Sequence, residues 1–160
     1  MLAEEYVKFL SDISDDKMKM LKKILVLTET QSEVILNEDI EKITEIVEEK
    51  QKHINEINKL DKKFELKLKE LKELVKIKSI SEIADLNIKG VGKLKNNVEC
   101  IMKEINNIKE VEDKNNIKIK EIFKGFGGTL NKINEGKKAT VAYTPFRNPE
   151  SKSYFIDKKK

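Results

Sequence analysis

Residues 35–43 read Ile-Leu-Asn-Glu-Asp-Ile-Glu-Lys-Ile and interrupt a long apolar pattern that continues on both sides. Asn and Asp favour turns and helix N-caps, because their side chains accept hydrogen bonds from free backbone N–H groups. Asn37 or Asp39 is therefore expected to cap a second helix. Since the connection is short, the two flanking helices should form an antiparallel hairpin.

Apolar residues recur at three- and four-residue spacing on both sides of this turn, which predicts helices over 2–36 and 40–77. The apolar stripe of the first contains Tyr6, Leu10, Ile13, Met20, Ile24, Leu27 and Val34. Lys17 and Gln31 occupy polar positions within that stripe. The stripe of the second contains Ile40, Ile43, Val47, Ile54, Ile57, Phe64, Leu68, Leu71 and Val75. No proline precedes Pro145, so nothing breaks these helices from within.

A linker over 78–90 should separate this hairpin from a third helix over 91–135. Within the linker, Ser79 to Leu86 is typical of a capped short helix or a turn. Gly90 and Gly92, where the third helix should begin, interrupt the helical pattern. The third stripe contains Leu94, Val98, Ile101, Ile105, Ile108, Ile119 and Ile122. Because Glu112 and Asn115 occupy stripe positions, we expect a weak point that divides this helix near residue 113.

The chain changes character after the third helix. Three glycines in the range 125–128 predict a soft joint, because glycine costs roughly 1 kcal/mol in a helix interior. From Gly136 onward seven basic and two acidic residues give a net charge of +5, whereas the whole chain carries +4. We therefore predict an all-α fold: an elongated antiparallel bundle or coiled coil of three long helices over 1–135, with an extended basic, aromatic tail over 136–160.

Composition argues against several classes of protein. Arg147 is the only arginine and the part of the chain before the tail is nearly neutral, whereas a nucleic-acid binder should carry a basic stripe on its folded body. The longest apolar run, Ile24 to Leu27, is far too short to cross a membrane. Glu4 and Glu5 stand where a signal peptide would be basic, so we expect a cytoplasmic protein.

The residues also give no indication of catalysis. Cys100 is the only cysteine, which excludes an intrachain disulfide and a multi-cysteine metal site. His53 has no ligand partners at metal-binding spacing, and no carboxylate pair stands out as acid and base. We therefore predict no enzymatic activity, no cofactor and no metal site.

Two segments at opposite ends of the chain resemble the FlgN family of flagellar export chaperones. The range 35–43, with Val-Glu-Glu-Lys-Gln at 47–51, is similar to the family's apolar–Asn–x–Asp turn followed by a Glu/Gln-rich helix. Gly-Lys-Lys-Ala-Thr-Val-Ala-Tyr at 136–143, with Phe-Ile-Asp-Lys-Lys at 155–159, is similar to the family's tail, where an alanine–tyrosine pair precedes a loop and a closing Ile-Asp-Lys. The glycines of 125–128 depart from the family, which usually keeps this region helical.

The resemblance implies a chaperone that escorts hook-filament junction proteins to the flagellar type III export apparatus. It implies that the end of the third helix binds the C-terminal helices of hook-associated proteins one and three. The residues at these positions are Ile119, Ile122, Phe123, Phe126, Leu130 and Ile133. Tyr143 is a candidate for contact with a client or with the export gate or export ATPase complex. The alternative for the stripe is that it belongs to the ordinary core. The alternative for Tyr143 is that it packs on the bundle of the same chain.

Other classes stay open at this point. A structural coiled-coil or adaptor protein that homo-oligomerises through the second helix would carry the same stripes. A helical protein associated with nucleic acid would bind with a strong salt dependence. The sequence leaves open which client is bound, whether the chain is a monomer or a dimer, and whether the third helix folds back or swaps onto a neighbour at Gly125–Gly128.

Overall fold

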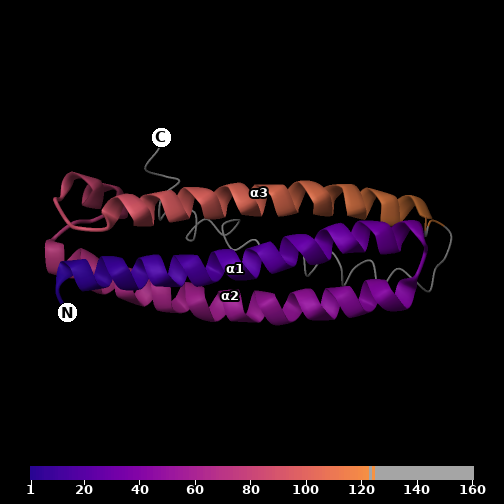
Figure 1. Cartoon of the computed structure of the whole chain (residues 1–160), viewed down its shortest axis with the longest axis horizontal. Coiled ribbons are helices and arrows are strands. Elements are labelled where there is room, and N and C mark those ends of the chain that lie inside the picture. Colours follow the sequence, from indigo (N-terminus) through magenta and orange to yellow (C-terminus); the bar gives the residue numbers. More distant parts are fainter. Residues whose placement is uncertain (123, 125–160) are drawn as a thin grey trace.

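The protein is described by a computed structural model over residues 1–122 and 124. These residues form the helices α1 (Ala3–Leu36), α2 (Ile40–Val75) and α3 (Val91–Ile122) and the short 3-10 helix η1 (Ile80–Asp85), without any strand (Figure 1). The predicted all-α class is therefore confirmed. The predicted continuation of the third helix to residue 135 and the tail over 136–160 lie outside the described residues.

The turn between α1 and α2 is short and capped as predicted. Asp39 is the N-cap of α2, and its Oδ1 accepts a hydrogen bond of 3.1 Å from the backbone N–H of Lys42. Asn37 ends α1 instead, and Glu38 takes a left-handed backbone conformation with a φ of 56°. Of the two expected caps, the structure selects Asp39.

Replacing Asp39 by alanine should lower the free energy of unfolding by about 1 kcal/mol, because a backbone donor loses its side-chain acceptor. Urea denaturation followed by circular dichroism measures the change. Glu45→Ala is the matched control, since Glu45 is an exposed acidic residue of the same helix and should change stability by less than about 0.5 kcal/mol. Equal effects of the two substitutions would contradict the capping role.

The linker is ordered around η1. The carboxylate of Glu82 accepts hydrogen bonds from the backbone N–H groups of Lys78 (2.8 Å) and Ser79 (3.0 Å). Ile80 and Ile83 are buried and close one end of the core. The second helix ends at Val75 rather than at residue 77, because Lys76 adopts a left-handed conformation that terminates the helix.

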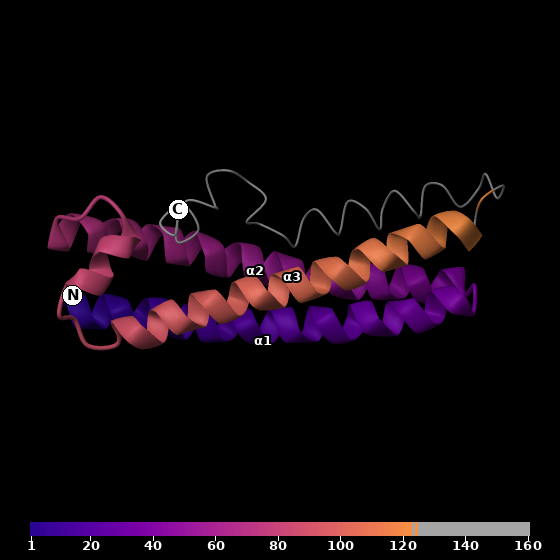
Figure 2. The same cartoon turned by 90° about the horizontal axis from the view of Figure 1, so that it is seen from above.

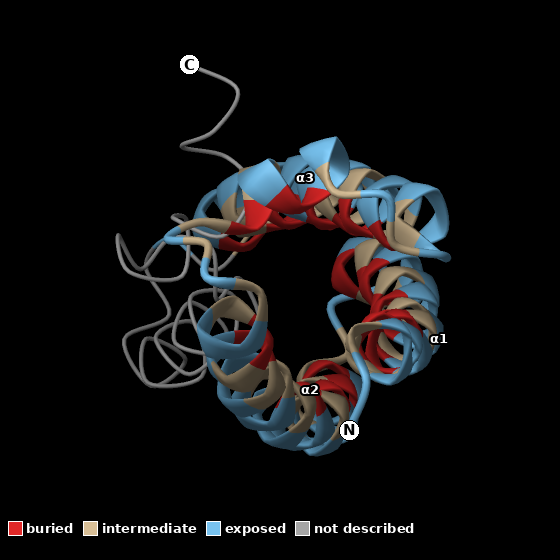
Figure 3. Cartoon of the chain, turned by 90° about the vertical axis from the view of Figure 1, so that its left-hand side faces the viewer, coloured by how far each residue is buried: buried red, intermediate tan, exposed pale blue. Residues whose placement is uncertain are grey.

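The three long helices form one elongated body in which α1 packs along both α2 and α3. The hairpin of α1 and α2 is antiparallel, as predicted, and α3 runs opposite to α2 and therefore in the same direction as α1 (Figure 1). Seen from above, α3 crosses the hairpin obliquely (Figure 2). The end that holds the N-terminus and η1 is called proximal, and the end that holds the α1–α2 turn and Ile122 is called distal. Seen from the proximal end, the buried residues of all three helices face inward (Figure 3).

The apolar core is divided into three clusters along the long axis. The proximal cluster contains the buried residues Val7, Leu10, Leu68, Leu71, Ile80, Ile83, Leu94 and Val98. The central cluster contains Leu21, Ile24, Ile54, Ile57, Ile101, Ile105 and Ile108. Among the described residues, the distal cluster contains the buried residues Ile35, Ile43 and Ile119. Within the hairpin, residues equidistant from Asp39 along the chain fall in the same cluster, as Leu21 and Ile57 do. The position of the turn therefore sets the register of α1 against α2.

Candidate functional site

The predicted client-binding stripe begins in the distal cluster. Ile119 is 4% exposed and packs with Ile35 of α1 and Ile43 of α2, and Ile122 lies partly buried against them. In the described structure these two residues therefore contribute to the protein's own core. The other predicted contact residues lie outside the described residues, and their role stays a prediction: Phe123, Phe126, Leu130, Ile133 and Tyr143.

Apolar side chains are also exposed near the distal end. Leu36, the last residue of α1, is 62% exposed, and Ile117 near the end of α3 is 58% exposed. Val34 and Ile40 pack against the distal cluster and are only partly buried. The distal end thus combines a small buried cluster with accessible apolar surface.

A layer of polar side chains separates the distal cluster from the central cluster. Its members come from all three long helices: Thr28, Gln31, Ser32, Lys50, Glu112 and Asn115. Lys50 and Glu112 form an ion pair between α2 and α3, and their side chains are each 2% exposed. The Nζ of Lys50 also donates to Oε1 of Gln31 at 3.1 Å. Polar side chains of all three long helices therefore meet between the two apolar clusters.

Asn115 joins α3 to α1 within the polar layer. Its Nδ2 donates to the backbone oxygen of Thr28 at 3.0 Å, and its Oδ1 accepts from the Ser32 hydroxyl at 2.5 Å. Glu112 and Asn115 are therefore paired with polar groups of α1 and α2. The helix continues through them without interruption, so the third helix is not broken near residue 113, and the expected weak point stays a prediction about its packing. Polar stripe positions do not break a helix when neighbouring helices supply their hydrogen-bond partners.

Burial changes the acid–base behaviour of this layer. Transfer out of water disfavours the charged ammonium group and lowers the pKa of Lys50 to about 7. The ion pair with Glu112 and the hydrogen bond to Gln31 hold the Lys50 side chain in place.

A second buried ion pair joins α1 to α2. Lys17 Nζ lies 2.7 Å from Oδ1 of Asp61, and Lys17 is 5% exposed. Burial lowers the pKa of Lys17, which the negative charge of Asp61 partly opposes, and burial raises the pKa of Asp61. Oδ2 of Asp61 is buried and has no hydrogen-bond partner among the described residues.

The sequence contained a signal for the Lys17–Asp61 pair and for the place of Lys50 beside α1, but none for the pairing of Lys50 with Glu112. Lys17 and Gln31 were recognised as polar residues in the first stripe, but Lys50 and Asp61 were missed. Asp61 stands as far after Asp39 as Lys17 stands before it, and Lys50 is related to Thr28 in the same way. The register of a hairpin with a short turn would therefore have placed these polar residues opposite one another.

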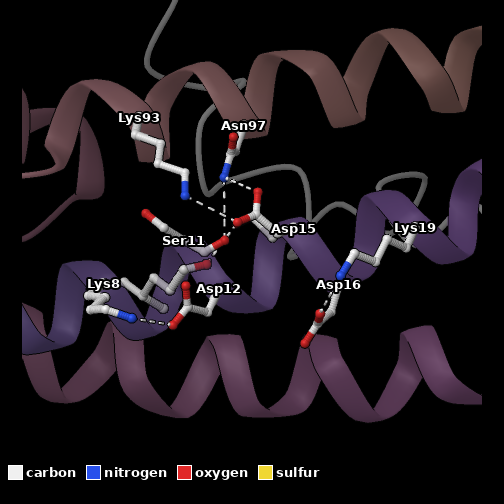
Figure 4. Close-up of polar contacts among 10 residues, drawn as sticks. Lys8, Ser11, Asp12, Asp15, Asp16, Lys19, Lys93 and Asn97 are labelled. Carbon is white, nitrogen blue, oxygen red and sulfur yellow. Dashed lines mark hydrogen bonds and ion pairs between the residues drawn. The ribbon is translucent and has the colours of Figure 1, made fainter.

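A polar contact fixes α3 against α1 near the proximal end (Figure 4). The carboxylate of Asp15 accepts a hydrogen bond of 3.2 Å from Lys93 and one of 3.0 Å from Nδ2 of Asn97. The same Nδ2 lies 3.3 Å from the backbone oxygen of Ser11. These contacts join parallel helices and help to set their relative register.

The described residues offer no cluster that could bind a metal ion. They contain no group of three His, Cys, Asp or Glu side chains that could hold a metal ion. His53 lies 3.9 Å from Glu49 on the helix surface, and Cys100 is an exposed thiol. Within this range no helix has the length and hydrophobicity that a membrane span requires. What the fold does present is long helical surface with an apolar distal end.

In comparison with known proteins, the family model described as FlgN protein matches residues 1–150 of the chain. The chain belongs to the FlgN family. Members of this family are flagellar export chaperones, so the expected family membership is confirmed. No curated protein matches the chain, and no solved structure does.

Proposed function

We propose that this flagellar export chaperone binds the C-terminal helices of hook-associated proteins one and three in the cytoplasm and delivers them to the type III export apparatus. The proposed working form is a three-helix bundle over 1–135 with a C-terminal arm over 136–160. Family membership supports the chaperone role. What we propose beyond this role is the client, the binding residues and the further partners. These partners are the export gate or the export ATPase complex.

The observation that carries the proposal is the small distal cluster. Ile119 and Ile122 begin a stripe that continues in the sequence through Phe123, Phe126, Leu130 and Ile133 at helical spacing. At its start this stripe is packed only in a cluster of three buried residues. An amphipathic helix that binds a partner helix through such a stripe is a recurrent mode of peptide recognition.

Binding energy would come mainly from apolar burial. Each of these side chains supplies roughly 1.5–3 kcal/mol when fully buried, before the cost of ordering the chain is subtracted. Such an interface should respond weakly to salt, because Debye screening acts on charges and not on apolar contact.

Size exclusion with light scattering tests the proposal, with the full chain measured alone and then mixed with the hook-associated proteins of the same organism. We expect a complex of fixed stoichiometry, and Phe123→Ala/Phe126→Ala should weaken it at least tenfold with unchanged helicity. Val26→Ala is the control, since Val26 is an apolar residue of α1 that is 62% exposed. Equal affinity of the double variant and the original chain would exclude the two phenylalanines from the site.

The second candidate function is a homo-oligomeric coiled-coil adaptor. The exposed side chains of Leu66 (57%) and Leu74 (48%) on α2 favour it, because they are available for association between copies. The same light-scattering experiment separates the two functions. A stable oligomer that binds no hook-associated protein would support the adaptor and contradict the client-binding proposal.

A further inference from the structure

We infer that the distal segment of α3, residues 112–122, opens from α1 and α2 as one unit, and that the polar layer sets the boundary of this unit. The inference concerns a conformational property of the fold. Its use in client binding rests on the proposed function, but the opening itself does not. The argument depends on how apolar and polar contacts are distributed along α3.

The apolar contacts of α3 are concentrated in its proximal part. Five apolar residues are buried between positions 94 and 108: Leu94, Val98, Ile101, Ile105 and Ile108. Between Glu112 and Ile122, where the described part of α3 ends, the buried residues are Glu112, Asn115 and Ile119, so only one of them is apolar. Separation of the proximal part would expose two large clusters, whereas separation of the distal part exposes one small cluster.

The polar layer lowers the cost of separation at its own position. When Glu112 moves away from Lys50, water can solvate both charges, and this recovers much of the solvation that was lost on burial. The hydrogen bonds of Asn115 to Thr28 and Ser32 can likewise be exchanged for bonds to water. Separated apolar side chains gain no such compensation. Opening that starts at the distal end is therefore expected to extend through Glu112 and to stop at Ile108.

Opening would leave the α1–α2 hairpin intact, because that hairpin has its own contacts along its length. It would uncover Ile35 and Ile43 on the hairpin and Ile119 on α3 at the same time. These side chains lie beside the start of the proposed client-binding stripe. Under the proposed function, the segment opens to admit a client helix and closes again after release.

Hydrogen–deuterium exchange with mass spectrometry tests the inference on the full chain. Amides of 112–122 should exchange at least tenfold faster than amides of 94–108, with a step at the polar layer. A gradual rise from 108 to 122 would indicate ordinary fraying of a helix end and would overturn the inference. Equal rates in both segments would overturn it as well.

Variants test whether the polar layer is the cause. Lys50→Met/Glu112→Leu should slow exchange of 112–122 at least tenfold relative to 94–108 of the same protein. The matched control is Lys17→Met/Asp61→Leu, which removes the other buried ion pair. Because that pair joins only α1 and α2, its removal should leave this ratio unchanged. Asn115→Leu provides a second variant if the first does not fold, and it should slow the distal amides in the same direction. Unchanged distal exchange in a folded variant would overturn the inference.

Failure of this inference and failure of the proposed function give different results. If the step in exchange is absent but a complex with hook-associated proteins forms, the opening unit is wrong and the chaperone proposal stands. If the step is present but no complex forms, the opening unit stands and the proposed clients are wrong.

Discussion

Replacing Lys50 by methionine is expected to destabilise the folded chain by about 3–5 kcal/mol at about pH 6, where Lys50 is charged in the folded chain, because the buried carboxylate of Glu112 loses its ammonium partner. Glu112 is 2% exposed, so water cannot replace that partner without opening the layer. A loss of this size is a large part of the 5–15 kcal/mol that stabilises a typical domain. Guanidinium denaturation followed by circular dichroism should show a clearly lower midpoint for this variant.

The double variant Lys50→Met/Glu112→Leu should recover this loss. Two apolar side chains of similar volume need no counter-charge, and replacement of a buried ion pair in this way is often neutral or stabilising by about 1–4 kcal/mol. Lys52→Met is the control on the same helix, since Lys52 is 75% exposed and 3.5 Å from Glu49. It should change stability by less than about 0.5 kcal/mol. A double variant as unstable as Lys50→Met alone would show that the polar layer does not act as a coupled pair.

The stability of the chain is expected to rise with pH between about 7 and 10. Lys50 has a pKa of about 7 in the folded protein and 10.5 as its ordinary value. In this window the unfolded chain binds the proton and the folded chain releases it, so the free energy of unfolding increases with pH. The contribution is fully present above pH 10.5 and is lost as the pH falls towards 7, with a full span of up to about 5 kcal/mol.

Denaturation at pH 7, 8, 9 and 10 measures this dependence, and the Lys50→Met/Glu112→Leu variant isolates it. Lys17, whose pKa burial also lowers, titrates in the same direction in both proteins and cancels when the two curves are subtracted. The difference between the curves should therefore grow with pH in favour of the original chain. Parallel curves would contradict titration of Lys50 in this range.

The long apolar stripes were sufficient to predict most of the secondary structure. Helices expected over 2–36 and 40–77 are found at Ala3–Leu36 and Ile40–Val75, and the short element after Ser79 is the 3-10 helix η1. Periodicity of this length is a strong local signal. The small errors occur at helix ends, where one residue such as Lys76 decides the boundary by its backbone conformation.

The candidate site could be predicted only in part. Ile119 and Ile122 were assigned to a client-binding stripe because of their spacing and a family resemblance, and the structure packs Ile119 inside the distal cluster. Spacing identifies an apolar face but does not identify the surface that covers it. Glu112 and Asn115 were interpreted as a weak point for a related reason, since a polar residue in a stripe has no visible partner in its own helix.

The amino-acid sequence by itself determined the helices, a short turn capped by Asn37 or Asp39 and the membership of a chaperone family, because each of these depends on residues close together in the chain or on a motif. The tertiary structure decided that α3 packs parallel to α1, that Lys50 of α2 meets Glu112 of α3, and that Asp15 binds Lys93 and Asn97. These contacts join residues far apart in the chain. Whether a buried charge weakens or organises a fold depends on the group that lies opposite, and only the packing of the helices supplies that group.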